Sequence, residues 1–360
     1  MADLNVNSIG DASGGTTATV NGFAPTVSNM AGRNRIINGD MRIDQRNAGA
    51  SVTPTTNNTY TLDRWTTYVS QASKFSVQQN AGAVTPPAGF RNYLGATSLA
   101  ATSLGASDYF FLQQVIEGFN VADLNWGTAS AQTVTLSFWV RSSLTGTFGG
   151  SLRNESANRS YPFSYSISSA NTWEQKTVTI AGDTTGTWVV NNGGGIQVAF
   201  SLGAGSTFSG TAGSWAGSNF VSATGATSVV GTNGATFYIT GVQLEEGSVA
   251  TPFEHRQYGQ ELALCKRYYQ TFYSANYPAF HYSTSVYTGV ILPVTMRTSP
   301  TITSNGQGTN YYEAGGAYSF SVSSYAGDNP STVSLQGSVT GGTNGYAGTF
   351  APTFQASAEL

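Results

Sequence analysis

Residues 242–256, VQLEEGSVATPFEHR, begin the most charged segment of a chain in which only 9% of residues are charged. Seven charged residues fall between positions 242 and 267, together with the single cysteine and one of the two histidines. The alternation at the start predicts a strand with Val242 and Leu244 facing a core. Gln243 and Glu245 would then point outward. A glycine and a proline turn the chain away after this strand.

A helical pattern follows in residues 258–272, YGQELALCKRYYQTF. Apolar residues recur at i, i+4, i+7 and i+11, which predicts one face of a helix. This face consists of Tyr258, Leu262, Cys265 and Tyr269. A helix of about a dozen residues is marginal in isolation, so its apolar face must pack on something. The same helix from sister chains would suffice.

Strand-length runs dominate the chain on both sides of this helix. Runs such as DYFFLQQVIEGF (108–119) and TVTLSFWVRSS (133–143) are separated by Gly, Asn, Asp, Ser and Pro. About nine such runs before the helix predict a large antiparallel sandwich, with Trp139 in its core. About six more strands in residues 273–360 predict a smaller β-sandwich. The expected fold is all-β, with domains at 33–253 and 273–360 and a connecting helix at 254–272.

A segment of low complexity, residues 203–236, interrupts the larger β domain. A structureless loop of this length is unusual in a compact domain. Phe208, Trp215 and Phe220 within it predict that it packs down on some part of the protein.

The composition excludes several classes of function. The net charge is −3, and no cluster of lysine and arginine provides a footprint for nucleic acid. No apolar run is long enough to insert into a membrane, and the first residues lack the features of a secretory signal. We therefore expect synthesis in a cytoplasm without signal-dependent export. One cysteine cannot form an internal disulfide, and no Cys/His set has zinc spacing.

The titratable residues do not predict an active site. His255 lies in a polar connector and His281 in an expected strand, where a structural role is the simpler interpretation. Glu245 and Glu246 are adjacent, so on a strand they point to opposite faces and make a poor catalytic pair. We predict no catalytic residue, and no cofactor is required.

Aromatic residues favour a binding function instead. Sugars are recognised by aromatic rings that stack on their C–H faces, and by amide, carboxylate and guanidinium groups that bind their hydroxyls. Most tryptophans of a sandwich belong to its core, so the candidates are drawn mainly from loops and short strands. They are Trp126, Trp215, Tyr277, Tyr282, Tyr311 and Tyr312.

Three motifs together resemble a module of bacteriophage tail fibre and tail spike-like proteins. They are RNRIINGDMRIDQR (33–46), YTLDRW (60–65) and FYITGVQLEEGSVATPFEHRQYGQELALCKRYYQ (237–270). In that module an INGD opening, a DRW near the second strand and a closing GVQLE segment frame a jelly roll. The frame is also similar to carbohydrate-binding modules of the galactose-binding type. We interpret Asp63 and Arg64 of DRW as a structural ion pair, with Trp65 in the core.

The resemblance implies a homotrimeric virion protein. Its polar residues 1–32 would dock to a tail or baseplate protein, and residues 273–360 would form the distal tip that faces the host. In the trimer, an acidic residue of one chain, Glu254 or Glu261, would pair with a basic residue of another and fix the register. The basic candidates are Arg256, Lys266 and Arg267.

The related carbohydrate modules hold a structural Ca²⁺ on a Phe-Glu opening and on an aspartate of the last strand. Here the opening continues as Asp40-Met41-Arg42, and the last strand reads YITG at 238–241. A hard cation needs several oxygen ligands, so these departures argue against calcium. We predict no metal site.

Three hypotheses remain. The leading one is a phage tail fibre component that attaches to glycans of the host surface. The second is a purely structural virion component, such as a head fibre, a collar or a spacer near the baseplate. The third is a polysaccharide depolymerase, which is disfavoured because the chain has no repeat period of the kind that a long parallel β-helix requires.

Overall fold

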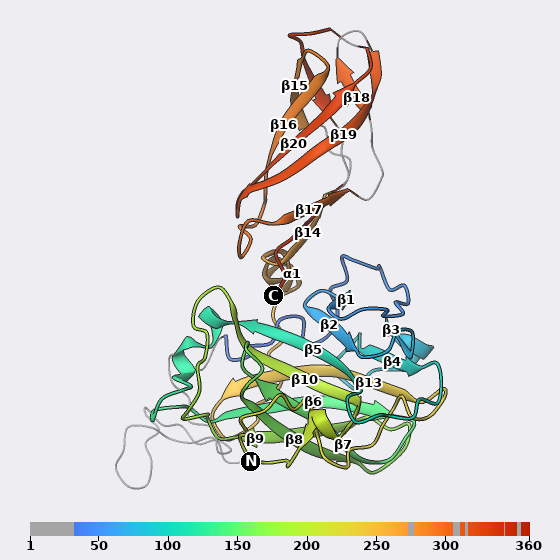
Figure 1. Ribbon diagram of the computed structural model, residues 1–360, viewed down its shortest axis with the longest axis vertical. Coiled ribbons are helices and arrows are strands. Elements are labelled where there is room, and N and C mark those ends of the chain that lie inside the picture. The colour runs from blue at the N-terminus through green and yellow to red at the C-terminus, as the bar shows by residue number, and fades with distance from the viewer. Residues whose placement is uncertain (1–31, 273–276, 305–309, 314–315, 342, 351–353) are drawn as a thin grey trace, which may run out of the picture. The chain divides into compact units, whose positions relative to one another are not determined.

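The computed structural model describes residues 32–272, 277–304, 310–313, 316–341, 343–350 and 354–360, and it confirms the predicted all-β fold (Figure 1). Apart from Gly32, the segment predicted to dock to a virion partner lies outside these residues. Contacts divide the chain into two compact units. The first contains residues up to 42, 49–59 and 66–255, and the second contains residues 43–48, 60–65 and 256–360.

The first unit is a sandwich of two antiparallel sheets. One sheet contains, in order, β2 (Trp65–Val69), β5 (Tyr109–Glu117), β10 (Gly194–Ala204), β7 (Gly146–Arg153) and β8 (Ser160–Ile167). The other contains β3 (Phe75–Gln79), β4 (Leu94–Ser98), β13 (Thr236–Glu246), β6 (Val134–Ser142) and β9 (Glu174–Ile180). Short 3₁₀ turns η1 (Ala81–Ala83), η2 (Gly118–Asn120) and η3 (Ala122–Leu124) lie between strands.

Aromatic rings from the two sheets meet in the core of the sandwich. Phe138 of β6 packs edge-on against Phe200 of β10, with ring centroids 5.0 Å apart. Phe75 of β3 meets Phe110 of β5 in the same way at 6.3 Å. These contacts follow from the alternation of the strands, which sends every second side chain inward. The prediction that Trp139 is a core residue is wrong, because its neighbour Phe138 takes the inward position and Trp139 is only half-buried.

Two glycines of the motifs lie where residues 34–40 pack closely on β13. A side chain at Gly39 would place its Cβ 2.2 Å from the carbonyl oxygen of Val242, whose own N–H donates to Gly39 O at 2.9 Å. Gly241 has φ +61° at a bulge in the pairing of β13 with β6, a backbone conformation that favours glycine. The opening and closing motifs are therefore parts of one packing arrangement.

The second unit contains two further sheets and the helix. Three strands pair in the order β14 (Tyr269–Phe272), β22 (Phe354–Ser357) and β17 (Thr301–Ser304). Six strands form a sheet that closes on itself: β15 (Tyr277–Tyr282), β16 (Ser285–Ile291), β20 (Thr332–Val339), β19 (Gly316–Asn329), β18 (Asn310–Glu313) and β21 (Ala347–Phe350). The second sandwich expected from the sequence is therefore a closed sheet, because β21 pairs with both β15 and β18. The short β1 (Thr59–Leu62) falls almost entirely in this unit.

Helix α1 (Tyr258–Lys266) ends earlier than its sequence pattern predicts. Tyr269 belongs to β14, where it pairs with Ser357. The residues buried on the helix are Glu261 and Cys265, whereas Tyr258 of the expected apolar face is 57% exposed. The apolar residues that predicted one helix face thus belong partly to a helix and partly to the strand that follows it.

The DRW motif ends at the first residue of β2, and Trp65 is fully buried as predicted. Arg64 pairs with Glu359 near the C-terminus, and its guanidinium lies 3.6 Å from the ring centroid of Tyr268. Asp63 accepts hydrogen bonds from the backbone and the side-chain amide of Gln45. Arg64 of the motif thus has an ion-pair partner almost 300 positions away in the sequence.

Candidate carbohydrate-binding pocket

A pocket of about 270 Å³ lies on the face of the β2–β5–β10–β7–β8 sheet that points away from the core of the sandwich. Phe110 and Leu112 of β5 face the core, so Phe111 between them faces this outer side. Strand register places Tyr68 and Ser201 beside Phe111, and places Gln197 beside Arg153. Side chains from four neighbouring strands therefore meet on one surface.

Part of the low-complexity segment folds back over this face. After η4 (Ser206–Phe208), the short strands β11 (Ser209–Gly210) and β12 (Ser222–Ala223) pair in parallel. The backbone of Ser160 exchanges two hydrogen bonds with that of Ala216, which ties the segment to β8. Val221 is buried against Phe111. The prediction that this segment packs down is confirmed: it lies against the sandwich and supplies one wall of the pocket.

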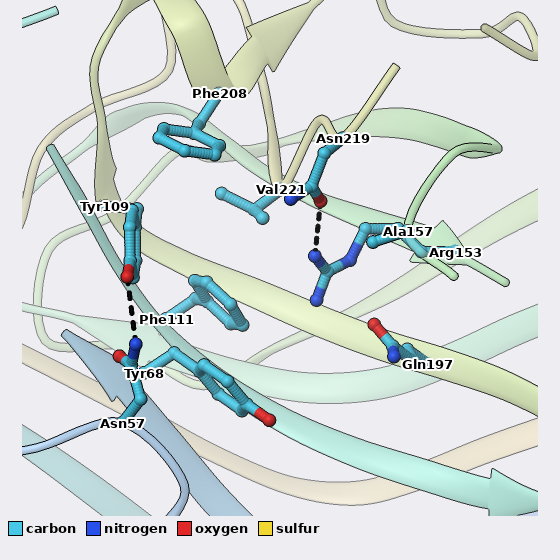
Figure 2. Close-up of a pocket in the computed structure, with 10 residues that line it drawn as sticks. All are labelled: Asn57, Tyr68, Tyr109, Phe111, Arg153, Ala157, Gln197, Phe208, Asn219 and Val221. Atoms are coloured by element: carbon cyan, nitrogen blue, oxygen red, sulfur yellow. Dashed lines mark hydrogen bonds between the residues drawn. The ribbon is translucent and has the colours of Figure 1, made fainter. Parts of the chain in front are cut away.

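Aromatic rings form one side of the pocket, as Figure 2 shows. Tyr68 stacks on Phe111 with ring centroids 5.0 Å apart and an angle of 3° between the rings. Tyr109 meets Phe208 edge-on at 4.9 Å. The complete lining is Asn57, Tyr68, Tyr109, Phe111, Arg153, Ala157, Gln197, Phe208, Asn219 and Val221.

Polar side chains lie at the edges of these rings. Asn57 accepts a hydrogen bond from the backbone N–H of Val69 and donates one to the hydroxyl of Tyr109 at 2.9 Å. These two bonds fix which end of the Asn57 amide carries the oxygen. Arg153 donates through Nη1 to Asn219 Oδ1 at 2.6 Å, and through Nη2 to Gln113 Oε1. The pocket therefore combines positioned amides with one cation.

Burial changes the acid–base behaviour of this cation and of the tyrosine near it. The pKa of Arg153 is lowered to about 10 by desolvation, with an opposing effect from Tyr68. Burial also raises the pKa of Tyr68, against the lowering effects of the Arg153 charge and a hydrogen bond with Gln113. At neutral pH the pocket therefore presents a guanidinium cation and a neutral phenol.

The residue types of the pocket suit recognition of a ligand. None of the ten lining residues is Asp, Glu or His, whereas glycoside hydrolysis commonly needs two carboxyl groups about the scissile bond. Neither histidine lines the pocket. His255 packs on the rings of Phe90 and Phe253, and His281 is buried 3.7 Å from Glu313.

The structure brings two predicted binding residues together, but outside the pocket. The ring centroids of Trp126 and Trp215 lie 5.3 Å apart, and both rings pack edge-on against Trp188. Their indole N–H groups donate to the backbone oxygens of Gln132 and Ala181. Both donors therefore stabilise loops of the first unit, and the structure does not test a role for either residue in binding.

The four predicted tyrosines lie in the second unit, and their exposure differs widely. Tyr311 is fully buried and Tyr277 packs against the core. Tyr282 is 62% exposed and Tyr312 is 41% exposed. Only the last two present large surfaces to solvent, and their role in binding stays a prediction.

The predicted trimer-contact residues also differ in exposure. Cys265 is fully buried and Tyr269 is 4% exposed, while Leu262, Lys266 and Arg267 are half-buried. Glu261 is buried beside Arg256 of its own chain, at 3.3 Å. Tyr258 is therefore the most exposed member of the set.

In the described part of the chain, no three His, Cys, Asp or Glu side chains gather as a metal site would require. Within the same part of the chain, no helix has the length and apolar character that a membrane crossing needs.

Sequence reasoning missed every residue that lines the pocket. A usable signal was present in DYFFLQQVIEGF, where strict alternation assigns Phe111 and Gln113 to the face opposite Phe110 and Leu112. A second signal was Arg153 within GTFGGSLR, a charged residue in a strand of small and apolar residues. Neither signal identifies the neighbouring strand, which depends on long-range pairing.

No protein-family signature matches the chain, and no curated protein matches its sequence. Among solved structures, the chain is similar to a putative sugar binding protein from Bacteroides thetaiotaomicron, at 12% identity over 60% of this chain and 100% of that one, with a TM-score of 0.35. It is also similar to the carbohydrate-binding module TmCBM61, solved with β-1,4-galactotriose, at 12% identity over 60% and 99% of the two chains, with a TM-score of 0.31.

A third similar structure is the enzymatically active domain of tailspike protein 4 from bacteriophage CBA120, at 12% identity and a TM-score of 0.30. The match covers 54% of this chain and only 21% of the tailspike chain. The structural neighbours thus include carbohydrate-binding modules and a phage tailspike domain. At these identities and TM-scores, none of them assigns a function to this chain.

Proposed function

We propose that this protein is a non-catalytic attachment protein of a phage tail fibre, and that its sandwich binds a glycan of the host surface in the pocket on β2, β5, β10 and β7. The observation that carries the glycan-binding part is the combination of stacked rings with positioned amide and guanidinium donors in one small pocket. The resemblance of the three motifs supports the tail fibre part.

The chemistry of the lining fits a sugar ring. Tyr68, Tyr109 and Phe208 offer aromatic surface for C–H groups, which have little affinity for water. Asn57 and Gln197 offer amides that can accept from and donate to hydroxyl groups. The volume of about 270 Å³ lies just below the roughly 300–1,000 Å³ that is typical of small-molecule sites, which suits a short segment of a glycan chain.

Binding of the purified full chain to a glycan array tests the proposal, with affinities measured by calorimetry. Replacing Tyr109 by alanine removes a ring that contacts Phe111 and Phe208, and we expect affinity to fall by about tenfold or more. Phe119→Ala is the matched control, because Phe119 is 61% exposed in the same unit and outside the pocket. Equal loss in both variants would argue against the pocket.

The host-attachment part needs a separate test. Purified protein should compete with phage particles for adsorption to host cells, and Tyr109→Ala should compete less well. A chain that binds no glycan and does not compete would support a structural virion component instead. Release of reducing ends from host polysaccharide would favour a depolymerase.

A further inference from the structure

Arg153 is a buried cation with neutral partners. Its residue is 4% exposed, and its two hydrogen bonds go to the amide oxygens of Asn219 and Gln113. Within the described part of the chain its Nε has no hydrogen-bond partner. A guanidinium has five N–H donors, so three donors of Arg153 are unused.

The only other arginine buried to this degree in the described residues has a different environment. Arg64, 1% exposed, forms an ion pair with Glu359. A buried charge is costly unless an opposite charge or several hydrogen bonds compensate for it. No ion pair of the described residues includes Arg153, and the nearby Glu155 accepts from the backbone N–H of Gly194. The buried arginine whose partners are all neutral is the one that lines the pocket.

The orientation of the side chain fits a ligand in the pocket. Figure 2 shows the guanidinium of Arg153 extending from β7 toward the aromatic side, with its two terminal nitrogens foremost. Its central carbon lies 5.1 Å from the ring centroid of Phe111. Each terminal nitrogen uses one hydrogen on an amide and keeps a second. Two parallel N–H donors match the two oxygens of a carboxylate.

We infer that the pocket takes an acidic sugar, whose carboxylate binds the terminal nitrogens of Arg153 while its ring contacts the aromatic side chains. This inference rests on the proposed glycan-binding function and specifies the class of sugar. A carboxylate would neutralise the one buried cation of the pocket, and the rings explain why a sugar acid fits better than a small free anion. Asn219 and Gln113 hold the guanidinium in place before the ligand arrives.

The test uses pairs of oligosaccharides that differ only in whether a sugar carries a carboxylate or a neutral hydroxymethyl group. Oligogalacturonate and its carboxyl-reduced counterpart are one such pair. Glucuronate, mannuronate and sialylated glycans are each compared with their neutral partners. We expect at least one acid to bind the full chain about ten- to hundredfold more tightly than its neutral partner in calorimetry, because hydrogen bonds to a charged group are strong. Added salt should weaken binding of the acid more than binding of the neutral sugar.

Two variants connect this preference to Arg153. Arg153→Gln should abolish the preference, because the amide carries no charge and cannot form a bidentate pair with a carboxylate. Some loss of stability is expected as well, since the substitution removes the hydrogen bonds to Asn219 and to buried Gln113, so the measurement that tests the inference is the ratio of acid to neutral affinity. Asn219→Asp, at an exposed residue, places a carboxylate beside the guanidinium and should bring the affinities for an acid and its neutral partner together, because the new carboxylate occupies the terminal nitrogens. This second variant decides the matter if Arg153→Gln does not fold.

The outcomes separate the inference from the proposed function. The inference is supported if the wild-type protein prefers acidic sugars and both variants lose that preference. Equal binding of acids and neutral sugars, lost in Tyr109→Ala, overturns the inference and leaves the glycan-binding function standing. Preference for sulfated or phosphorylated sugars over carboxylated ones also overturns it. Absence of binding to every member of the panel overturns the glycan-binding function itself.

Discussion

Asp63 is a buried carboxyl group in the second unit, and it should make stability depend on pH. Desolvation raises its pKa to about 6, although the charge of Arg46 and hydrogen bonds from Gln45 lower it. In the unfolded chain the pKa is close to 3.8. Between these two values the folded state holds a proton that the unfolded state has lost, so this group's contribution to the free energy of unfolding falls as pH rises.

We predict a loss of about 3 kcal/mol from this group between about pH 4 and pH 6, and none beyond that window. Asp63→Asn should remove this component, because the amide does not titrate and can still accept from Gln45. Urea unfolding of both proteins at several pH values measures the difference. Paired carboxylates such as Asp183, whose pKa is lowered, give the opposite slope in both proteins and cancel in the comparison. Parallel stability curves would contradict the prediction.

At the scale of elements, the end of β13 and the segment after it form a buried polar network. Glu245 accepts hydrogen bonds from the backbone N–H of Thr251 at 2.8 Å and from its hydroxyl at 2.6 Å. Gln243 donates to Glu245 and accepts from the backbone N–H of Glu254. The carboxylate of Glu254 accepts from the backbone N–H groups of Gly32 and Asn34. The charges of the closing motif thus join the start of the described chain to the last strand of the sandwich.

Two adjacent glutamates provide a direct test of this network. Glu245 is 2% exposed, whereas Glu246 is exposed. Glu245→Ala should destabilise the protein by about 2–4 kcal/mol, since it leaves the two buried donors of Thr251 without their acceptor. Glu246→Ala should change stability by about 0.5 kcal/mol or less. Chemical denaturation of both variants measures the contrast, and similar effects would show that the network contributes little.

These elements also show how far the sequence predicts the structure. Alternation identified the strands and the sandwich, and it placed Val242 and Leu244 correctly in the core. The same alternation predicted Gln243 and Glu245 as outward residues, yet they are 0% and 2% exposed. They do point away from the core, but the segment at 251–254 covers them. A local pattern gives the face of a strand and not what packs over that face.

The pocket was unpredictable for the same physical reason. Phe111 and Arg153 are more than forty positions apart, and they meet only because β10 pairs with both β5 and β7. The covering residues Phe208 and Val221 come from a segment with no periodic pattern. Aromatic content alone therefore drew attention to tryptophans such as Trp126, whose N–H stabilises a loop.

At the scale of the whole molecule, the predicted trimer would bring several glycan pockets to one particle. Four large apolar side chains of the second unit are exposed: Tyr258 is 57% exposed, and Phe280, Tyr282 and Ile291 are 49%, 62% and 81% exposed. Several linked sites bind a cell surface more tightly than one site, by as much as about 10²–10⁴-fold when the geometry allows.

Charge reversal on the helix separates assembly from recognition. We predict that the double variant Lys266→Glu, Arg267→Glu dissociates the trimer, because these residues would face acidic groups of a sister chain. Sedimentation equilibrium should then give the mass of one chain, whereas Arg91→Glu, an exposed reversal in the first unit, should keep the mass of three.

Calorimetric affinity for a soluble glycan should stay the same in the double variant, because the pocket lies wholly in the first unit. Binding to whole cells should fall at least tenfold, because the linked sites are lost. A wild-type chain with the mass of a monomer would refute the trimer, and loss of calorimetric affinity in the double variant would mean that the helix also shapes the pocket.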